Sequence, residues 1–427
     1  MNPIQFKNSL KGELAELRIK QQSGKQNISM RDLSIVSGDK QLMKEAKNLK
    51  STIAERKFGL LDDTMKRQLG AYFGTLIGDA LGAPFEFFGV NINGRVIPDK
   101  QLQFPSDVKD YEKSYDSKNI MVNSECTNTH FNFNCSCLAG MWSDDSSQMI
   151  ALAEVLIAYK KVNAQLMFAI EDWYEHGFGI AYNSQLNHLV KKLNHGDDKG
   201  SFDIGNTTVE SLRKLSSLNI KRDSTSTYAT QSGTPTSNGN GALMRNSATF
   251  FIKDLQQAVQ QAYEHAKMTH RGEISALCCS FHTFTGWCLI NNQHLKNGWP
   301  KTEQFILEME KANIPLTNEE FNIIINSQGI SNWRSPDFKF SEEKINGYLG
   351  GYVADCLVIA LNYVYHGKEL QHLATLGGDS DTNAAVAGSL FGAKHGIQYF
   401  EQNWIEAVMR FDENDFNCAR VLALIGM

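Results

Sequence analysis

The stretch QLGAYFGTLIGDALGAP, residues 68–84, places a glycine at every fourth position, at residues 70, 74, 78 and 82. Residues four apart lie on one face of an α-helix, so this face can approach a neighbouring backbone closely. Because each glycine costs about 1 kcal/mol relative to alanine inside a helix, tight packing must offset the loss. Similar spacing occurs in membrane helices, but Asp79 and the short apolar length favour a buried core helix.

Helical periodicity dominates the rest of the chain. Alternating strand patterns are absent, and the Gly, Ser and Thr-rich residues 224–240 indicate a loop. The fold class is therefore expected to be all-α. We predict helices at residues 149–162, 164–174, 208–218, 255–269, 274–290, 302–312, 350–365 and 383–395.

Two segments stand apart from this helical core. Residues 1–62 are rich in Lys, Glu and Gln, with leucines at roughly helical spacing, which favours an N-terminal helical extension that acts as a clasp or tail. Residues 63–427 are expected to form one large domain. A polar stretch at about residues 89–139 is expected to be an irregular insertion in that domain.

The charge balance and the N-terminus limit the partners. The chain has 42 Lys and Arg against 47 Asp and Glu, so no basic excess predicts a nucleic-acid partner. The opening MNPIQFKNSLKGELAELRIK carries charges where a signal peptide needs apolar residues, and no apolar run could span a membrane. We expect a cytoplasmic protein with no membrane partner, while export through a system that reads other signals stays open.

The eight cysteines favour buried thiols in a reducing compartment. Cys278 and Cys279 are adjacent, and Cys356 lies inside an apolar run. A separate group could bind zinc, but its spacing matches no common structural zinc site, so free thiols or a redox-sensitive loop are favoured. This group comprises Cys126, His130, Cys135 and Cys137.

A first acidic cluster lies in WSDDSSQMIALAEVLIAYKK, residues 142–161, directly ahead of a predicted amphipathic helix. Ser143 or Asp144 would make a good N-cap, and capping is the simpler interpretation. Capping explains one acid at most, whereas Asp144 and Asp145 beside Ser143 and Ser146 offer oxygen ligands of the kind that Mg²⁺ or Mn²⁺ prefers.

A second cluster repeats the pattern in TLGGDSDTNAAVAGSLFGAKHGI, residues 375–397. Asp379 and Asp381 precede a helix and could point the same way, with the Thr382 hydroxyl beside them. An EF-hand calcium loop would need glycine at its sixth position and glutamate at its twelfth, and neither is present. The two clusters together predict a metal-dependent active site.

Six motifs occur in an order and approximate spacing that strongly resembles the ADP-ribosylglycohydrolase family, over roughly residues 65–400. They are GTLIGDALGAPFEF (74–87), SDDS (143–146), GNGALMR (239–245), MTHRG (268–272), GYVADCLVIAL (351–361) and GGDSDT (377–382). The resemblance implies a compact, orthogonal helical single domain, expected to be a monomer, with two Mg²⁺ or Mn²⁺ ions in a cleft for ADP-ribose.

The resemblance also implies roles for individual residues. The metal ligands would be Ser143, Asp144, Asp145, Asp379, Asp381 and Thr382, and Asp381 would bridge the two ions. Glu86, Asp145 and Asp381 would be the catalytic residues. Without the resemblance, Glu86 could equally be a helix-end carboxylate.

The ligand would be held by the GNGALMR loop and by MTHRG. The implied ligand-binding residues are Ser237, Gly239, Asn240, Gly241 and His270. Glycine allows backbone N–H groups to approach a phosphate closely. A histidine at the end of a helix could otherwise be a cap, and Arg245 could pair with phosphate but is more often part of a buried structural ion pair in this setting.

Some positions depart from the family pattern. Ser146 stands where many relatives have threonine, Cys356 replaces a frequent threonine, and Asn238 stands where some relatives carry an aromatic residue that stacks on adenine. Adenine recognition would then use another aromatic side chain, which the sequence does not identify.

The expected function is a metal-dependent hydrolase that removes mono-ADP-ribose from an ADP-ribosylated protein, with arginine the favoured linkage and ADP-ribose the product. The glycosidic bond would break through a transition state with oxocarbenium character. Serine-linked, oligomeric and O-acyl ADP-ribose remain alternatives. The rival from another class is an inactive ADP-ribose-binding pseudoenzyme, which the presence of both acidic clusters disfavours. A cysteine nucleophile beside His270 is disfavoured by its apolar surroundings.

Overall fold

A computed structural model describes residues 34–83, 86, 140–182, 201, 203–218, 222–326, 333–334, 350–374, 376, 378–412 and 414–427. The predicted insertion at 89–139 and the first part of the predicted N-terminal extension lie outside the described residues. The possible zinc ligands Cys126, His130, Cys135 and Cys137 lie outside them too.

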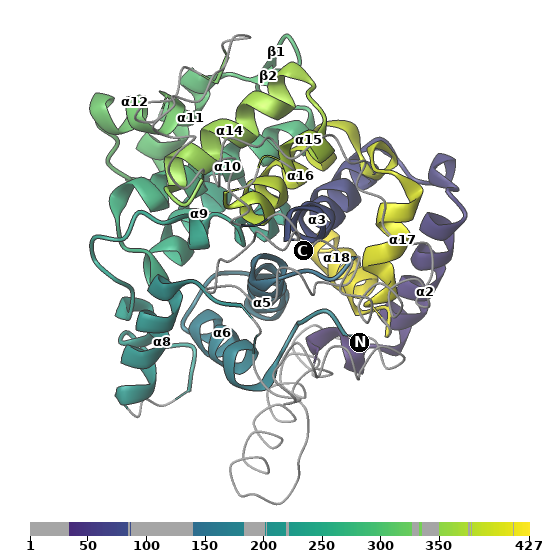
Figure 1. Ribbon diagram of the computed structural model, residues 1–427, viewed down its shortest axis with the longest axis horizontal. Coiled ribbons are helices and arrows are strands. Elements are labelled where there is room, and N and C mark those ends of the chain that lie inside the picture. Colours follow the sequence, from purple (N-terminus) through teal and green to yellow (C-terminus); the bar gives the residue numbers. More distant parts are fainter. Residues whose placement is uncertain are drawn as a thin grey trace, which may run out of the picture.

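Helices account for nearly all regular structure in the described residues, which confirms the all-α prediction (Figure 1). The α-helices are α2 (Lys40–Ala54), α3 (Asp63–Gly82), α5 (Asp144–Tyr159), α6 (Gln165–His176), α8 (Asn206–Ser217), α9 (Leu255–Thr269), α10 (Glu273–Asn291), α11 (Thr302–Lys311), α12 (Asn318–Asn326), α14 (Val353–His366), α15 (Leu370–Ala374), α16 (Ser380–His395), α17 (Gln402–Arg410) and α18 (Phe416–Ile425).

Short 3₁₀ helices and one small hairpin connect these helices. The 3₁₀ helices are η2 (Ile35–Gly38), η3 (Phe58–Leu60), η7 (Ala229–Gln231), η8 (Asn240–Ala242), η9 (Asn246–Phe251) and η10 (Ile397–Tyr399). The hairpin pairs β1 (Leu295–Lys296) with β2 (Trp299–Pro300) in antiparallel fashion.

Helices α3 and α16 form the centre of the fold and touch backbone to backbone. A Cβ atom added at Gly74 would lie 2.2 Å from the carbonyl oxygen of Gly388, and one added at Gly78 would lie 2.0 Å from that of Ala384. The close approach predicted for the glycine face is confirmed, and its partner is the small-residue face of α16. The two helices run antiparallel, because Gly70 meets Gly392 at the other end of the contact.

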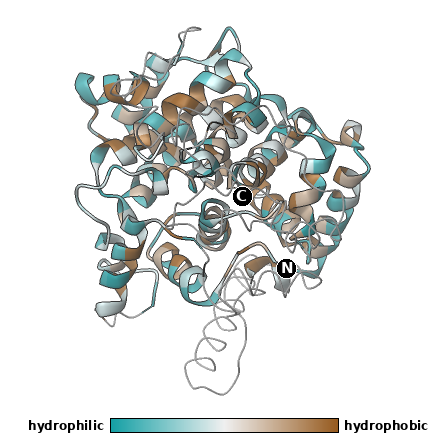
Figure 2. Cartoon of the chain, viewed as in Figure 1, coloured by the Kyte–Doolittle hydropathy of each residue, from teal (hydrophilic) through white to brown (hydrophobic). Residues whose placement is uncertain are grey.

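The remaining helices surround this pair and bury its other faces. In Figure 2 the hydrophobic segments gather along the inner helices, and the hydrophilic segments lie mostly at the periphery. Helix α5 was predicted to be amphipathic, but every residue from Asp144 to Ile157 is buried. The prediction failed because α5 is covered on several sides by other helices, among them α6, α18 and α3. No helix in the described ranges has both the length and the apolar character needed to cross a membrane.

The described part of the N-terminal segment packs on the same body. Helix α2 lies against α18, and Leu49 and Ile53 on it are buried. The carboxylate of Glu154, on α5, accepts hydrogen bonds from the Ser34 hydroxyl and from the Ile35 backbone N–H at 2.7 Å. The segment is thus attached to the helix that carries the first acidic cluster.

Candidate active site

Asp79 holds the beginning of α5. Its Oδ1 accepts the backbone N–H of Ser143 at 2.8 Å, and its Oδ2 accepts that of Ser146 at 2.9 Å. N–H groups at a helix start have no partner within the helix. Asp79 therefore caps α5 from the neighbouring helix α3, whereas a cap is ordinarily a residue of the helix it serves.

The Ser143 hydroxyl faces the acids instead of capping the helix. Ser143 occupies the N-cap position without a side-chain cap hydrogen bond. Its Oγ lies 3.1 Å from Asp145 Oδ2 and 3.3 Å from Asp381 Oδ2. The capping interpretation of this side chain is wrong because the Asp79 carboxylate already accepts the N–H groups. Asp144 is also not the cap, since the helix begins at that residue.

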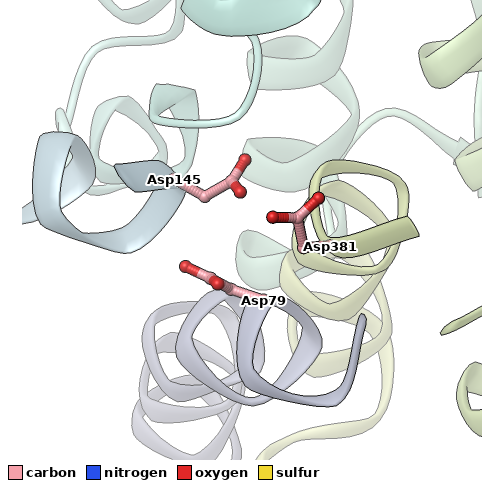
Figure 3. Close-up of side chains that lie close together, drawn as sticks. All are labelled: Asp79, Asp145 and Asp381. Atoms are coloured by element: carbon pink, nitrogen blue, oxygen red, sulfur yellow. The ribbon is translucent and has the colours of Figure 1, made fainter. Parts of the chain in front are cut away.

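Three carboxylates from three helices converge at this point. Asp79 on α3, Asp145 on α5 and Asp381 on α16 direct their carboxylates toward a common space (Figure 3). One oxygen from each lies within 4.8 Å of the other two. The glycine contact between α3 and α16 makes this possible, because it brings the C-terminal end of α3 against the start of α16.

A second group shares Asp381 with the first. Carboxylate oxygens of Glu86, Asp379 and Asp381 also lie within 4.8 Å of one another. The Ser380 hydroxyl donates a 2.9 Å hydrogen bond to the carbonyl oxygen of Gly82, which fixes the end of α3 beside the start of α16. The structure thus brings together the two acidic clusters and Glu86, as the sequence predicted.

Burial and mutual repulsion raise the pKa values of these carboxyl groups. Burial raises the pKa of Asp79 to about 6. Burial is also the largest cause for Glu86, whose pKa is further raised by the charges of Asp203, Asp379 and Asp144. The pKa values of Asp145 and Asp381 lie well above the ordinary range of an aspartate for the same reasons.

The donor set fits divalent cations. Asp145 Oδ1 is buried without a hydrogen-bond partner among the described residues. The charges that act on Asp145 and Asp381 come from acids, with no basic group among the causes of their pKa shifts. Buried carboxylates need a partner of opposite charge, and an all-oxygen set suits a hard cation such as Mg²⁺ or Mn²⁺. The two groups of acids could therefore hold metal ions.

The predicted ligand loop lies next to the acids. The Asn240 side chain donates 2.7 Å hydrogen bonds to Asp379 Oδ2 and to the carbonyl oxygen of Gly350. Ser237 Oγ lies 3.1 Å from Thr207 Oγ1, near the start of α8. Gly239 pairs with Tyr352 in an isolated antiparallel bridge. These contacts place Ser237, Gly239 and Asn240 between α8, the start of α14 and the acidic cluster.

His270 occupies the space that the loop glycines leave. A Cβ atom added at Gly241 would lie 2.9 Å from Cε1 and 3.0 Å from Nε2 of His270, and one at Gly239 would lie 3.5 Å from Nε2. His270 stands at the C-cap position of α9, and its imidazole is directed to the loop. The structure therefore joins His270 to the glycine loop, as the sequence predicted.

Arg245 differs from its expected role. Its guanidinium is fully buried and donates to four neutral acceptors: Gln148 Oε1 at 2.9 Å, Gly241 O at 3.0 Å, His265 O at 3.2 Å and Thr269 Oγ1 at 2.7 Å. No acid of the described residues forms an ion pair with it, so the expected buried ion pair is wrong. Carbonyl, amide and hydroxyl oxygens accept the hydrogens of its two Nη atoms instead.

Asn238 has a structural role in place of an aromatic side chain. Its Oδ1 accepts the backbone N–H of Ser275, in the first turn of α10, at 3.2 Å. Its carbonyl oxygen accepts the N–H of Val353 at 3.0 Å. Asn238 thus joins the ligand loop to the starts of α10 and α14.

The buried thiols support packing over nucleophilic catalysis. Cys278, Cys279 and Cys356 are free and buried, as predicted. Burial raises the pKa of Cys279 to about 12, which keeps the thiol protonated at neutral pH.

Two acids of the site were missed by the sequence analysis. Asp79 was treated only as a polar residue that argues against a membrane helix. Asp203 lies three residues before α8, and its charge helps to raise the pKa values of Glu86 and Asp144. Burial raises the pKa of Asp203 itself to about 6. The available signal was an acid next to a predicted helix start in SFDIGNTT, residues 201–208.

Sequence comparison agrees with this geometry. The profile of the family described as ADP-ribosylglycohydrolase matches residues 61–425. The chain belongs to the ADP-ribosylglycohydrolase family. It is accordingly a hydrolytic enzyme of the ADP-ribosylglycohydrolase class.

Individual members of the ADP-ribosylglycohydrolase family are distant in sequence. The chain is 23% identical to ADP-ribosylarginine hydrolase Tri1 of Serratia proteamaculans (strain 568), over 82% of this chain and 76% of that protein. It is 24% identical to ADP-ribosylarginine hydrolase Tri1 of Pseudomonas putida (strain GB-1), over 81% of this chain and 75% of that protein. A solved structure titled ADP-ribosylglycohydrolase-related protein complex shares the fold, with a TM-score of 0.52 and 19% identity over 86% of this chain and all of that one.

Proposed function

We propose that this ADP-ribosylglycohydrolase removes mono-ADP-ribose from arginine side chains of proteins in a reaction that depends on divalent cations. The observation that carries the proposal is the convergence of Asp145, from the first acidic cluster, with Asp381, from the second, beside Glu86. Neither cluster alone would distinguish a hydrolase from a protein that merely binds an ion.

The acids would hold the cations on two sides of Asp381. Asp79, Asp145 and Asp381 form one group, and Glu86, Asp379 and Asp381 form the other, so Asp381 would be a ligand common to both groups. Both Asp79 oxygens already accept N–H groups, so within the first group Asp79 would act mainly by positioning Ser143, Asp144 and Asp145, while Asp145 and Asp381 would be the direct ligands. Bound Mg²⁺ or Mn²⁺ would supply positive charge that orients the ribose hydroxyls and makes water more acidic.

Glu86 is the best candidate for proton transfer. Burial and neighbouring acids raise the pKa of Glu86, and a raised pKa makes its carboxylate a stronger proton acceptor. In the proposed reaction the bond between ribose C1″ and the guanidine nitrogen breaks, and a water oxygen bonds to C1″. Glu86 would take a proton from the water, and the leaving guanidine would gain one.

The loop at residues 237–241 would hold the diphosphate and adenosine side of the ligand. Asn240 connects this loop to Asp379, so the part that binds the ligand and the part that binds the ions are linked by one side chain. The glycines leave backbone N–H groups accessible to anionic oxygens.

Arginine is the proposed linkage because two relatives carry the name ADP-ribosylarginine hydrolase. The decisive experiment incubates the purified chain with arginine-linked and serine-linked ADP-ribosyl peptides, each with Mg²⁺, Mn²⁺ or EDTA, and measures free ADP-ribose. We expect release from the arginine-linked peptide with a divalent cation and none with EDTA.

The variant Asp381→Ala separates hydrolysis from binding. It should lose ADP-ribose release and lower the number of Mn²⁺ ions bound, measured by calorimetry. Near wild-type release by Asp381→Ala in EDTA would disprove the metal dependence. Binding of ADP-ribose by the wild type without release from any linkage would identify an inactive binding protein, and release from the serine-linked peptide alone would change the substrate.

A further inference from the structure

Thr269 stands between a buried cation and the histidine of the ligand loop. Arg245 Nη2 donates a hydrogen bond to Thr269 Oγ1 at 2.7 Å, and the same Oγ1 lies 2.8 Å from His270 Nδ1. Arg245, Thr269 and His270 are all buried, so water does not compete freely for these contacts.

The direction of the second hydrogen bond follows from the first. A guanidinium can only donate, so Thr269 Oγ1 is the acceptor of the Arg245 N–H. The hydroxyl keeps one hydrogen to donate, and His270 Nδ1 is the only acceptor for it among the contacts of the described residues. Nδ1 is then the unprotonated nitrogen, and a neutral imidazole must carry its hydrogen on Nε2.

The Nε2 edge of His270 faces the ligand loop. Nε2 would lie 3.0 Å from a Cβ atom at Gly241 and 3.5 Å from one at Gly239, so any other residue at Gly241 would collide with the ring. Nε2 forms no hydrogen bond within the described part of the chain, whereas Nδ1 contacts the Thr269 hydroxyl. Nε2 is therefore the ring nitrogen that is available to donate to a molecule bound at the loop.

We infer that Arg245 and Thr269 are positioning residues that fix His270 as the Nε2–H tautomer, so that it donates to an oxygen of ADP-ribose at Gly239–Gly241. This inference rests on the proposed function for the identity of the ligand. The tautomer itself does not depend on the ligand.

The charge state of His270 agrees with this assignment. Burial, followed by the positive charge of Arg245, lowers the pKa of His270 to about 3, so the ring is neutral at physiological pH. Arg245 also accounts for the position of the loop, because its Nη1 donates to the Gly241 carbonyl oxygen at 3.0 Å. One side chain thus holds both the loop and, through Thr269, the histidine that faces it.

Nitrogen NMR of the full chain labelled with ¹⁵N-histidine tests the tautomer directly. The His270 signals are those that disappear in His270→Gln. In the wild type with no ligand added we expect an unprotonated Nδ1 and a protonated Nε2. A protonated Nδ1 would overturn the inference. The tautomer is measured on the wild type, and His270→Gln serves only to assign the signals.

Two substitutions at Thr269 test the positioning role. Thr269→Val keeps the shape but removes the hydroxyl, and it should give a mixture of tautomers and about tenfold weaker ADP-ribose binding by calorimetry with Mg²⁺ present. Thr269→Ser should restore both the single tautomer and the affinity. If Thr269→Val lowers only thermal stability and leaves tautomer and affinity unchanged, Thr269 is merely structural.

The outcome remains separable from the proposed function. A wild type that fails to bind ADP-ribose while showing the Nε2–H tautomer would reject ADP-ribose as the ligand and keep the Arg245–Thr269–His270 arrangement. A wild type that binds ADP-ribose with a protonated Nδ1 would keep ADP-ribose as the ligand and reject the Arg245–Thr269–His270 arrangement.

Discussion

Asp79 shows how one carboxylate can organise a site from the helix next to it. Each of its oxygens accepts a backbone N–H at the start of α5, and these bonds fix the residues that carry Asp144 and Asp145. The same carboxylate is buried beside Asp145 and Asp381. Its charge therefore stabilises the start of α5 and repels its acidic neighbours at once, and a cation would relieve the repulsion.

The first prediction concerns the pH dependence of stability without metal. Burial raises the pKa of Asp79 from 3.8 to about 6 in the folded state, so the folded chain keeps a proton that the unfolded chain releases. For a shift of this size, the retained proton adds on the order of 3 kcal/mol to the free energy of unfolding. This contribution is fully present below the pKa of the unfolded state and is lost as the pH rises through about 6.

Urea unfolding of the metal-free chain should therefore show stability that falls from about pH 4 to about pH 7. Saturating Mg²⁺ or Mn²⁺ should reduce or reverse the fall, because cations favour ionised carboxylates. Stability of the metal-free chain that rises with pH over this range would contradict the electrostatic description of the acids.

The second prediction concerns the aromatic residue that would contact adenine. The Tyr352 backbone pairs with Gly239, and its half-buried side chain belongs to the segment that flanks the ligand loop. Tyr352→Ala should weaken ADP-ribose binding by about tenfold or more if the ring stacks on the base. Tyr352→Phe keeps the ring and should bind nearly as well. Equal affinity of the alanine variant and the wild type would exclude stacking by this residue.

At the residue scale, the sequence predicted the acids that sit in recognisable motifs and missed those whose role depends on tertiary contacts. Asp145 and Asp381 follow helix-start patterns and were found. Asp79 lies inside a helix, and only its contact with the start of α5 reveals its role. Arg245 was expected to have an acidic partner because a buried charge ordinarily needs one, yet carbonyl and hydroxyl oxygens satisfy it.

Helices α3 and α16 illustrate how packing at the element scale sets the geometry of the site. Their small residues allow the backbones to touch, so the distance between the two helices does not depend on the size of any side chain between them. The ends of the two helices carry Asp79 and Asp381. The spacing of the acids is therefore fixed by main-chain contact.

The third prediction tests this contact with one added methyl group. In Gly78→Ala the new Cβ would lie 2.0 Å from the Ala384 carbonyl oxygen, which is backbone and has no room to move. Overpacking of this kind costs about 1–3 kcal/mol and sometimes more. We expect a clear loss of unfolding free energy and weaker Mn²⁺ binding, measured by urea unfolding and calorimetry.

Gly59→Ala is the matched control for this substitution, because no atom lies within 4 Å of its added Cβ. It should unfold like the wild type. A Gly78→Ala chain as stable as the Gly59→Ala chain would mean that the two helices can separate without penalty.

The presence of each helix was easier to predict than the residue at which it begins. The first acidic helix was expected from residue 149 and begins at Asp144, and the second was expected from residue 383 and begins at Ser380. Both errors have the same cause. The first turns carry acids and hydroxyls, which resemble a loop in sequence, but in the fold they are the turns that face the site.

At the scale of the whole molecule, residues 34–60 of the N-terminal segment pack against the body of the enzyme. The family profile begins at residue 61, yet residues before it bury apolar side chains against α18 and α5. Glu154 receives hydrogen bonds from Ser34, Ile35 and Arg420, which joins the segment, α5 and α18 at one carboxylate. The buried apolar residues of the segment are Val36, Ala46, Leu49, Ile53 and Phe58.

The fourth prediction is that residues 63–427, the domain predicted from the sequence, do not fold stably without the residues that precede them. A chain that begins at Asp63 would expose the apolar surface that α2 covers, and each large side chain lost from the interface is worth about 1.5–3 kcal/mol. We expect low solubility or a much lower midpoint of thermal unfolding. A chain that begins at Ser34 keeps these contacts and is the control.

Equal thermal midpoints for the two truncated chains would show that residues 34–62 are a tail and not a clasp, the two alternatives that the sequence left open. Composition could not reveal the attachment because the segment is polar overall and few of its described residues are buried. The contacts with Glu154 and with α18, both far away in the chain, show where the segment docks.

The backbone contact between α3 and α16 also restricts how this enzyme can diversify. Every missense change at a glycine codon introduces a side chain with a Cβ atom, and at Gly74 that atom would lie 2.2 Å from the Gly388 carbonyl oxygen. Every single substitution at Gly74 therefore produces this clash. Lineages that acquire new substrates should therefore vary in the connections around the two helices, where added length leaves the spacing of Asp79 and Asp381 untouched.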